Sequence, residues 1–134
     1  MLLLETGDQQ FRDHWNGFKE AWTSQKGNEH VVTSPKGYAW YIKDLGWGNL
    51  RHMGNAAALV LWGAKSEGNK GERDRLVCWA HGQISYALGE GGRSYVVGFG
   101  NNPPVRPHHR GASCPSAPAN TAASTLLLTE VFAQ

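Results

Sequence analysis

Two stretches with helical periodicity, separated by a glycine-containing turn, constrain the fold of this chain more than any other feature. The first begins at Asn49 and the second runs from about Glu72 to Leu88, with Gly68 marking the break between them. A run of three alanines favours helix in the first stretch. The apolar positions that fit the helical pattern are Leu50, Met53, Ala57, Val60, Leu61 and Ala64, then Leu76, Val77, Ala80, Ile84, Ala87 and Leu88. Two helices joined in this way form an antiparallel hairpin, so the sequence predicts an all-α fold.

An aromatic stripe near the start of the chain predicts a further helix. Phe11, Trp15, Phe18 and Trp22 are spaced by four, three and four residues, which places them on one helical face that we expect to point toward the core. From Thr23 to Gly48 this pattern dissolves into glycine, proline and closely spaced aromatic residues. That composition predicts a long connection with room for a short extended piece.

The segment Gly98–Arg110 reads GFGNNPPVRPHHR, a composition that fits neither a regular helix nor a strand. Glycine permits backbone conformations closed to other residues, and proline fixes φ and ends a helix. Just before it, Ser94–Val97 is a short β-like run. We therefore expect a stiff loop that presents two imidazoles and a guanidinium at its end.

Composition excludes several classes of partner. The chain has 134 residues, the length of one ordinary domain, and its net charge of +2 is spread without basic runs. We therefore expect neither nucleic acid nor a charged membrane surface as a partner. Apolar runs are far shorter than the ~18 residues of a membrane-spanning helix, and the opening Met1–Leu4 is too short for a signal peptide. A neutral partner fits as well as any other. The six tryptophans offer flat faces that suit either a core or a stacked ligand.

Three stretches resemble glycoside hydrolase family 9, the endoglucanases or cellulases. They are Ser34–Trp40 (SPKGYAW), Leu45–Arg51 (LGWGNLR), and Gln83–Gly89 (QISYALG) together with the segment that runs from Ser94 to Arg110. The resemblance covers roughly residues 11–118, and these stretches are more similar to the animal enzymes than to the plant ones. It implies an all-α fold that is part of an (α/α)6 barrel with long loops. We expect residues 1–118 to form a partial catalytic domain and residues 119–134 a divergent tail.

The resemblance also implies a glucan site. It assigns His108 as the active-site histidine, Arg110 and Arg51 as cleft residues that bind the sugar, and Trp47 as an aromatic that stacks under a glucose ring. A glucan is uncharged, with apolar ring faces and hydroxyl edges, so these side chains suit it. From the residues alone, Trp47 reads more readily as a core residue and Arg110 as an ordinary loop arginine. His52 occupies a place where related sequences often have tyrosine.

The implied reaction is hydrolysis of internal β-1,4-glucosidic bonds with inversion, which needs one carboxylate and one carboxylic acid. The family's paired aspartates have no counterpart here, and the last glutamate, Glu130, lacks the surrounding motif. We therefore expect the chain by itself to be inactive. A non-catalytic carbohydrate-binding fragment and a helical interaction protein stay open as alternatives.

No cofactor is expected, and the histidines and cysteines lack the spacing of a structural zinc site. The oxidation state of Cys78 and Cys114 stays open. The resemblance implies a secreted protein that acts on cellulose or cello-oligosaccharide.

Overall fold

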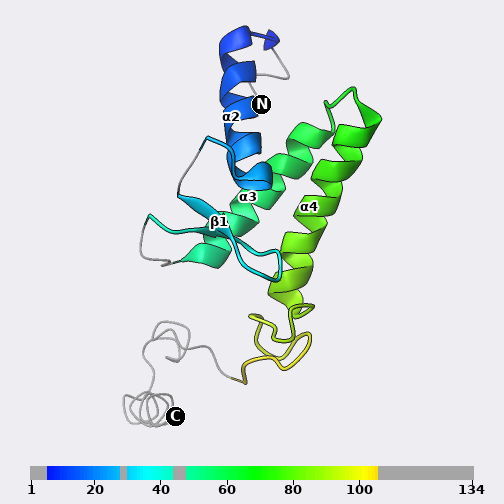
Figure 1. Cartoon of the computed structure of the whole chain (residues 1–134). Coiled ribbons are helices and arrows are strands. Elements are labelled where there is room, and N and C mark those ends of the chain that lie inside the picture. Colours follow the sequence, from blue (N-terminus) through cyan, green and yellow to red (C-terminus); the bar gives the residue numbers. More distant parts are fainter. Residues whose placement is uncertain (1–5, 28–29, 44–47, 106–134) are drawn as a thin grey trace, which may run out of the picture. The chain divides into compact units, whose positions relative to one another are not determined.

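The computed structural model describes residues 6–27, 30–43 and 48–105. Along the chain the elements are α2 (Gln9–Ser24), β1 (Val31–Thr33), β2 (Ala39–Tyr41), α3 (Asn49–Ala64) and α4 (Lys70–Leu88), as Figure 1 shows. The chain divides into two compact units, Met1–Ala87 and Leu88–Gln134. The expected tail, residues 119–134, lies outside the described residues.

The aromatic stripe forms one face of α2, as predicted. Asp8 caps the helix by accepting a 2.8 Å hydrogen bond from the Gln10 backbone N–H. Trp15, Phe18 and Trp22 pack against the core, and successive ring centroids along the stripe are 6.2 and 6.3 Å apart. These rings, together with the buried Ala21, are the contribution of α2 to the hydrophobic core.

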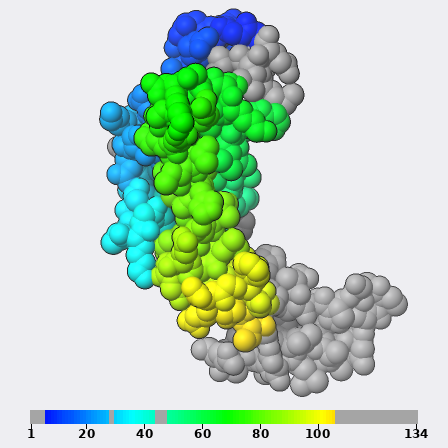
Figure 2. All heavy atoms as spheres, turned by 90° about the vertical axis from the view of Figure 1, so that its right-hand side faces the viewer, coloured from blue at the N-terminus to red at the C-terminus, as the bar shows by residue number. Residues whose placement is uncertain are grey.

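Helices α3 and α4 form the predicted hairpin and supply the centre of the core (Figure 1). The centre consists of Met53, Ala57, Val60 and Ala64 from α3 and Leu76 and Ala80 from α4. Asn69 caps α4, because its Oδ1 accepts a 3.1 Å bond from the Glu72 backbone N–H. In Figure 2, α4 runs down the face toward the viewer, with α2 and the strands along one edge.

Not all of the apolar positions that define the helical faces of this hairpin are buried. Leu50, Leu61, Val77, Ile84 and Leu88 are exposed. Burial follows one narrow stripe on each helix, so a residue one position beyond a buried one is turned by about 100° away from the core. The sequence pattern missed Gln83, which is buried on α4, and Trp79, which packs against the core.

The long connection contains a β-hairpin, which goes beyond the expected short extended piece. Strands β1 and β2 are antiparallel, with Val32 opposite Trp40. The Gln83 amide fixes the hairpin to α4: its Oε1 accepts a 2.8 Å bond from the Ala39 backbone N–H, and its Nε2 donates a 2.8 Å bond to the Gly37 carbonyl. A buried amide is thus fully used in joining two elements.

In the second unit, the described residues after α4 form a turn-rich loop. The β-like run Ser94–Val97 is not a strand there, so that prediction is wrong. Ser94 is fully buried; its backbone N–H donates to the Asn101 carbonyl at 2.6 Å, and its hydroxyl accepts a 3.0 Å bond from the Val96 backbone N–H. Local side-chain bonding of this kind competes with a strand ladder.

The described residues comprise three α-helices of 16, 16 and 19 residues and one two-stranded sheet, which agrees with the predicted all-α class apart from the small hairpin. In these same residues no helix is long and apolar enough to cross a bilayer.

Candidate functional site

Arg51 is the predicted site residue that the structure describes, and it lies in the first turn of α3. The other three, Trp47, His108 and Arg110, lie outside the described residues, as do Glu130 and Cys114. Cys78, on α4, is a free and exposed thiol. The geometry of the candidate site is therefore built from the start of α3 and its neighbours.

The turn that begins α3 depends on Gly48. This residue has φ 66°, in the left-handed region that glycine adopts without strain. Its carbonyl accepts bonds from the backbone N–H groups of Arg51 at 3.0 Å and of His52 at 3.3 Å. A Cβ at position 48 would lie 3.4 Å from Arg51 Nη2, so the guanidinium folds back over this turn.

The Asn49 side chain joins the end of β2 to the start of α3. Its Oδ1 accepts a 2.8 Å bond from the Tyr41 backbone N–H, and its Nδ2 donates a 3.1 Å bond to the Tyr41 carbonyl. The amide thereby satisfies both backbone groups of a strand residue, as a partner strand would. The sequence located Asn49 as the start of the helix but offered no signal for this pairing.

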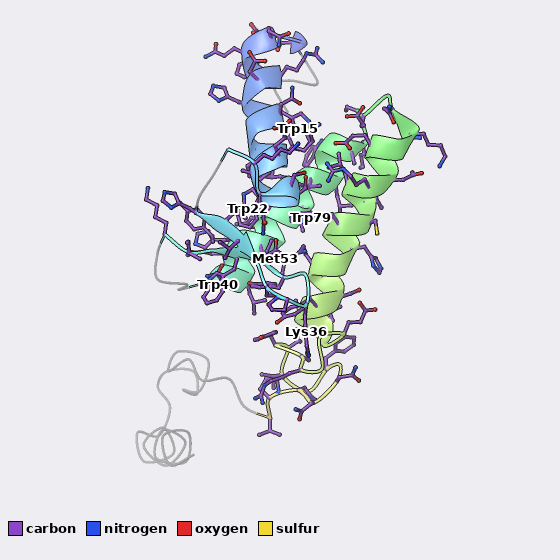
Figure 3. The ribbon with its side chains drawn as sticks, viewed as in Figure 1. Trp15, Trp22, Lys36, Trp40, Met53 and Trp79 are labelled. Carbon is purple, nitrogen blue, oxygen red and sulfur yellow. The ribbon has the colours of Figure 1, made fainter. Side chains whose placement is uncertain are left out.

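Tyr41 is the centre of a cluster of rings from three segments. Its ring centroid lies 6.3 Å from that of Trp22, 6.2 Å from that of His30 and 5.4 Å from that of His52. All four residues are half-buried. Figure 3 labels Trp22 on α2, Met53 on α3 and Trp40 on β2. Trp40 is 42% exposed. The cluster joins α2, the β-hairpin and α3 around Tyr41.

Arg51 and His52 are in direct contact. Arg51 Nη2 lies 3.1 Å from His52 Nε2. A guanidinium has N–H donors and no acceptor, so Nε2 must accept this bond and the ring proton must be on Nδ1. Arg51 is exposed, and the N–H donors of a guanidinium suit the hydroxyl groups of a neutral sugar.

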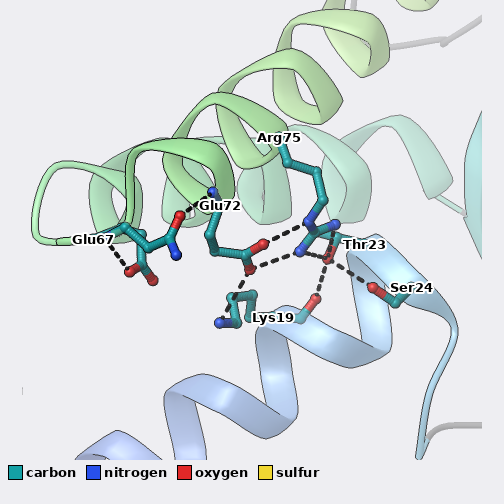
Figure 4. A network of polar contacts seen from close by, with 7 residues as sticks. Lys19, Thr23, Ser24, Glu67, Glu72 and Arg75 are labelled. Carbon is teal, nitrogen blue, oxygen red and sulfur yellow. Dashed lines mark hydrogen bonds and ion pairs between the residues drawn. The ribbon is translucent and has the colours of Figure 1, made fainter.

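The strongest electrostatic feature in the described residues lies elsewhere, between α2 and α4 (Figure 4). Glu72 accepts bonds of 2.7 and 2.9 Å from Arg75 and is 3.3 Å from Lys19 Nζ. Arg75 also donates to Thr23 Oγ1 at 3.2 Å. The hydrogen bond from Arg75, followed by Lys19, lowers the pKa of Glu72 from 4.5 to about 2.

Glu72 is therefore a poor general acid, since a general acid needs a carboxyl whose pKa is raised. The bond from Lys70 likewise lowers the pKa of Asp74. Within the described ranges no three His, Cys, Asp or Glu side chains gather as metal ligands would.

Comparison with known proteins agrees with the family resemblance. The model of a family described as glycosyl hydrolase family 9 matches residues 3–129. Endoglucanase B of Cellulomonas fimi is 39% identical over 114 residues, which are 84% of this chain and 11% of that protein. Endoglucanase 8 of Oryza sativa subsp. japonica is 63% identical over 46 residues, which are 33% of this chain and 9% of that protein.

A solved structure has a similar fold. The endoglucanase of the termite Nasutitermes takasagoensis matches with a TM-score of 0.66 and 41% identity, over 88% of this chain and 25% of that one. This match confirms the predicted fold class, part of an (α/α)6 barrel. The chain spans 11% and 15% of the length of two bacterial relatives, and 25% of the termite chain. Since the family model matches nearly the whole sequence, the chain belongs to glycosyl hydrolase family 9.

Proposed function

We propose that this chain is part of the catalytic domain of an endo-β-1,4-glucanase, and that its ligand is a β-1,4-glucan such as cellulose or cello-oligosaccharide. The observation that carries the proposal is the family match over residues 3–129, together with relatives named as endoglucanases. In the complete enzyme the reaction is hydrolysis of internal glucosidic bonds with inversion. Cellulose is an insoluble polymer, so the enzyme acts outside the cell, and recovery of the native protein only from cell lysate would contradict this location.

The chain supplies part of the wall that binds the glucan. Arg51 donates hydrogen bonds to sugar hydroxyls, and its exposed position on the first turn of α3 supports this role. By resemblance, Trp47 stacks on a glucose ring, Arg110 donates to the sugar, and His108 acts at the cleavage point. A neutral polymer with apolar faces and hydroxyl edges requires this combination of aromatic and donor groups.

The chain by itself binds glucan without cleaving it. Inverting hydrolysis needs a base and an acid that lie several ångströms apart. The aspartates, Asp8, Asp13, Asp44 and Asp74, form no adjacent pair, and the carboxyl pKa shifts resolved for Glu72 and Asp74 are both downward. The same observation favours the second candidate function, a carbohydrate-binding chain without catalysis.

Binding and turnover test the proposal separately. We expect saturable binding of cellohexaose in titration calorimetry and no release of reducing sugar from carboxymethylcellulose. Trp47→Ala should abolish binding, whereas Trp62→Ala, which changes an indole 50% exposed on α3, should leave it unchanged. A flat titration of the folded wild-type chain would refute glucan binding. Hydrolysis that disappears in His108→Ala would refute the expected inactivity.

A further inference from the structure

The first turn of α3 holds two neighbouring side chains that differ in how firmly they are fixed. His52 is half-buried and packs against Tyr41, whereas Arg51 is exposed. Tyr41 is in turn fixed through both of its backbone groups by Asn49. A long exposed side chain loses much rotamer freedom when it binds a ligand. A firmly held neighbour can order that side chain before the ligand binds, which lowers the entropy lost on binding.

The contact between the two side chains has a defined direction. Arg51 Nη2 donates to His52 Nε2 at 3.1 Å, because a guanidinium cannot accept. The same nitrogen faces the backbone turn at Gly48, where a Cβ would be 3.4 Å away. The guanidinium is thus in contact with an imidazole acceptor and with a turn that has no side chain.

We propose that His52 positions the Arg51 guanidinium for glucan recognition and makes no contact with the sugar itself. This inference rests on the proposed function, because it assigns Arg51 as the donor to glucan hydroxyls. A guanidinium carries five N–H groups, and the bond to His52 uses one of them. The ring of His52 supplies rigidity through Tyr41, and its Nε2 supplies direction.

Two substitutions test separately the two properties of His52, its aromatic ring and its hydrogen-bond acceptor. His52→Phe keeps an aromatic ring against Tyr41 but cannot accept a hydrogen bond, and His52→Gln keeps an acceptor. We expect His52→Phe to raise the Kd for cellohexaose about 2- to 10-fold, the effect of one side chain that must be ordered on binding. His52→Gln should restore most of the affinity. His14→Phe, at an exposed position on α2, is the matched control and should change nothing.

A double-mutant cycle tests whether His52 acts through Arg51. Arg51→Ala should weaken binding about 10-fold or more, because it removes a charged donor. If His52 works only by positioning, adding His52→Phe to Arg51→Ala has no further effect. Additive losses would overturn the proposal, because they would mean that His52 contacts the glucan directly.

A measurement without ligand keeps the inference separate from the proposed function. Nitrogen-15 NMR reports how fast the Arg51 guanidinium rotates about its Cζ–Nε bond. We expect slower rotation in the wild type and in His52→Gln than in His52→Phe. Equal rates in all three would refute positioning even if glucan binds. Slow rotation with no glucan binding would uphold positioning and refute the proposed function alone.

Discussion

The two ends of α3 differ in what holds them. At its C-terminal end, Val60 and Ala64 are buried in the core, and Gly63 receives the ring of Trp15. At its N-terminal end, hydrogen bonds from Asn49 and a ring contact from His52 hold the structure, and Arg51 is exposed. One helix thus has an end fixed by apolar packing and an end fixed by directional polar contacts. The polar end can therefore present a functional group, because packing at the other end supplies stability.

The largest expected effect tests the packed end. Leu76 is fully buried on α4 against this part of α3, whereas its neighbour Val77 is 43% exposed. Leu76→Ala should destabilise the chain by about 2–5 kcal/mol through lost burial and a residual cavity. Val77→Ala should change the free energy of unfolding by about 0.5 kcal/mol or less. Urea denaturation followed by circular dichroism measures both, and equal losses would contradict the narrow buried stripe.

A smaller effect tests the contact between α2 and α3. A Cβ at Gly63 would lie 2.2 Å from the Trp15 ring, so Gly63→Ala forces the indole to move. Overpacking of this kind should cost about 1–3 kcal/mol, against a gain of about 1 kcal/mol in helix propensity. Gly54, also in α3, has nothing within 4 Å of such a Cβ, so Gly54→Ala should be stabilising. The midpoint of thermal unfolding should therefore fall in Gly63→Ala and rise in Gly54→Ala. A shift of both midpoints in the same direction would argue against the tight Trp15 contact.

The ionic network between α2 and α4 provides a pH-dependent test. Because the pKa of Glu72 is lowered from 4.5 to about 2, its contribution to stability is complete above about pH 4.5 and is lost as the pH falls toward 2. At neutral pH, Glu72→Gln should cost about 1–2 kcal/mol, and less at pH 2.5. Glu20→Gln, at an exposed position on α2, is the control. Chemical denaturation at both pH values measures the loss, and a loss of Glu72→Gln that does not depend on pH would contradict the network.

The smallest expected effect on stability tests the polar end. Asn49→Ala removes both bonds to Tyr41 and should cost about 0.5–1.5 kcal/mol. Hydrogen exchange at the Tyr41 amide should become faster, whereas Asn55→Ala, at an exposed position on the same helix, should leave it unchanged. Unaltered exchange in Asn49→Ala would show that Asn49 does not hold the end of β2.

Periodicity predicted the helices well because helix propensity and the spacing of apolar residues are local properties of the sequence. The stripe Trp15, Phe18 and Trp22 packs as expected, and α3 begins at the predicted Asn49. The same pattern did not show which apolar residues are buried, since Val77 and Ile84 fit it and are exposed. How wide a buried stripe becomes depends on which other elements cover the helix, and periodicity does not contain that information.

The amino-acid sequence alone predicted the helical class through its periodicity. It predicted the family, and Arg51 as a candidate sugar-binding residue, through its resemblance to glycoside hydrolase family 9. Trp47, His108 and Arg110 stay predictions, as they lie outside the described residues. Only the tertiary structure brought Asn49 to Tyr41 and Gln83 to Ala39, at separations of 8 and 44 residues along the chain. The physical reason is that a side-chain amide forms a useful bond only where folding has placed a backbone group within about 3 Å, which no local pattern encodes.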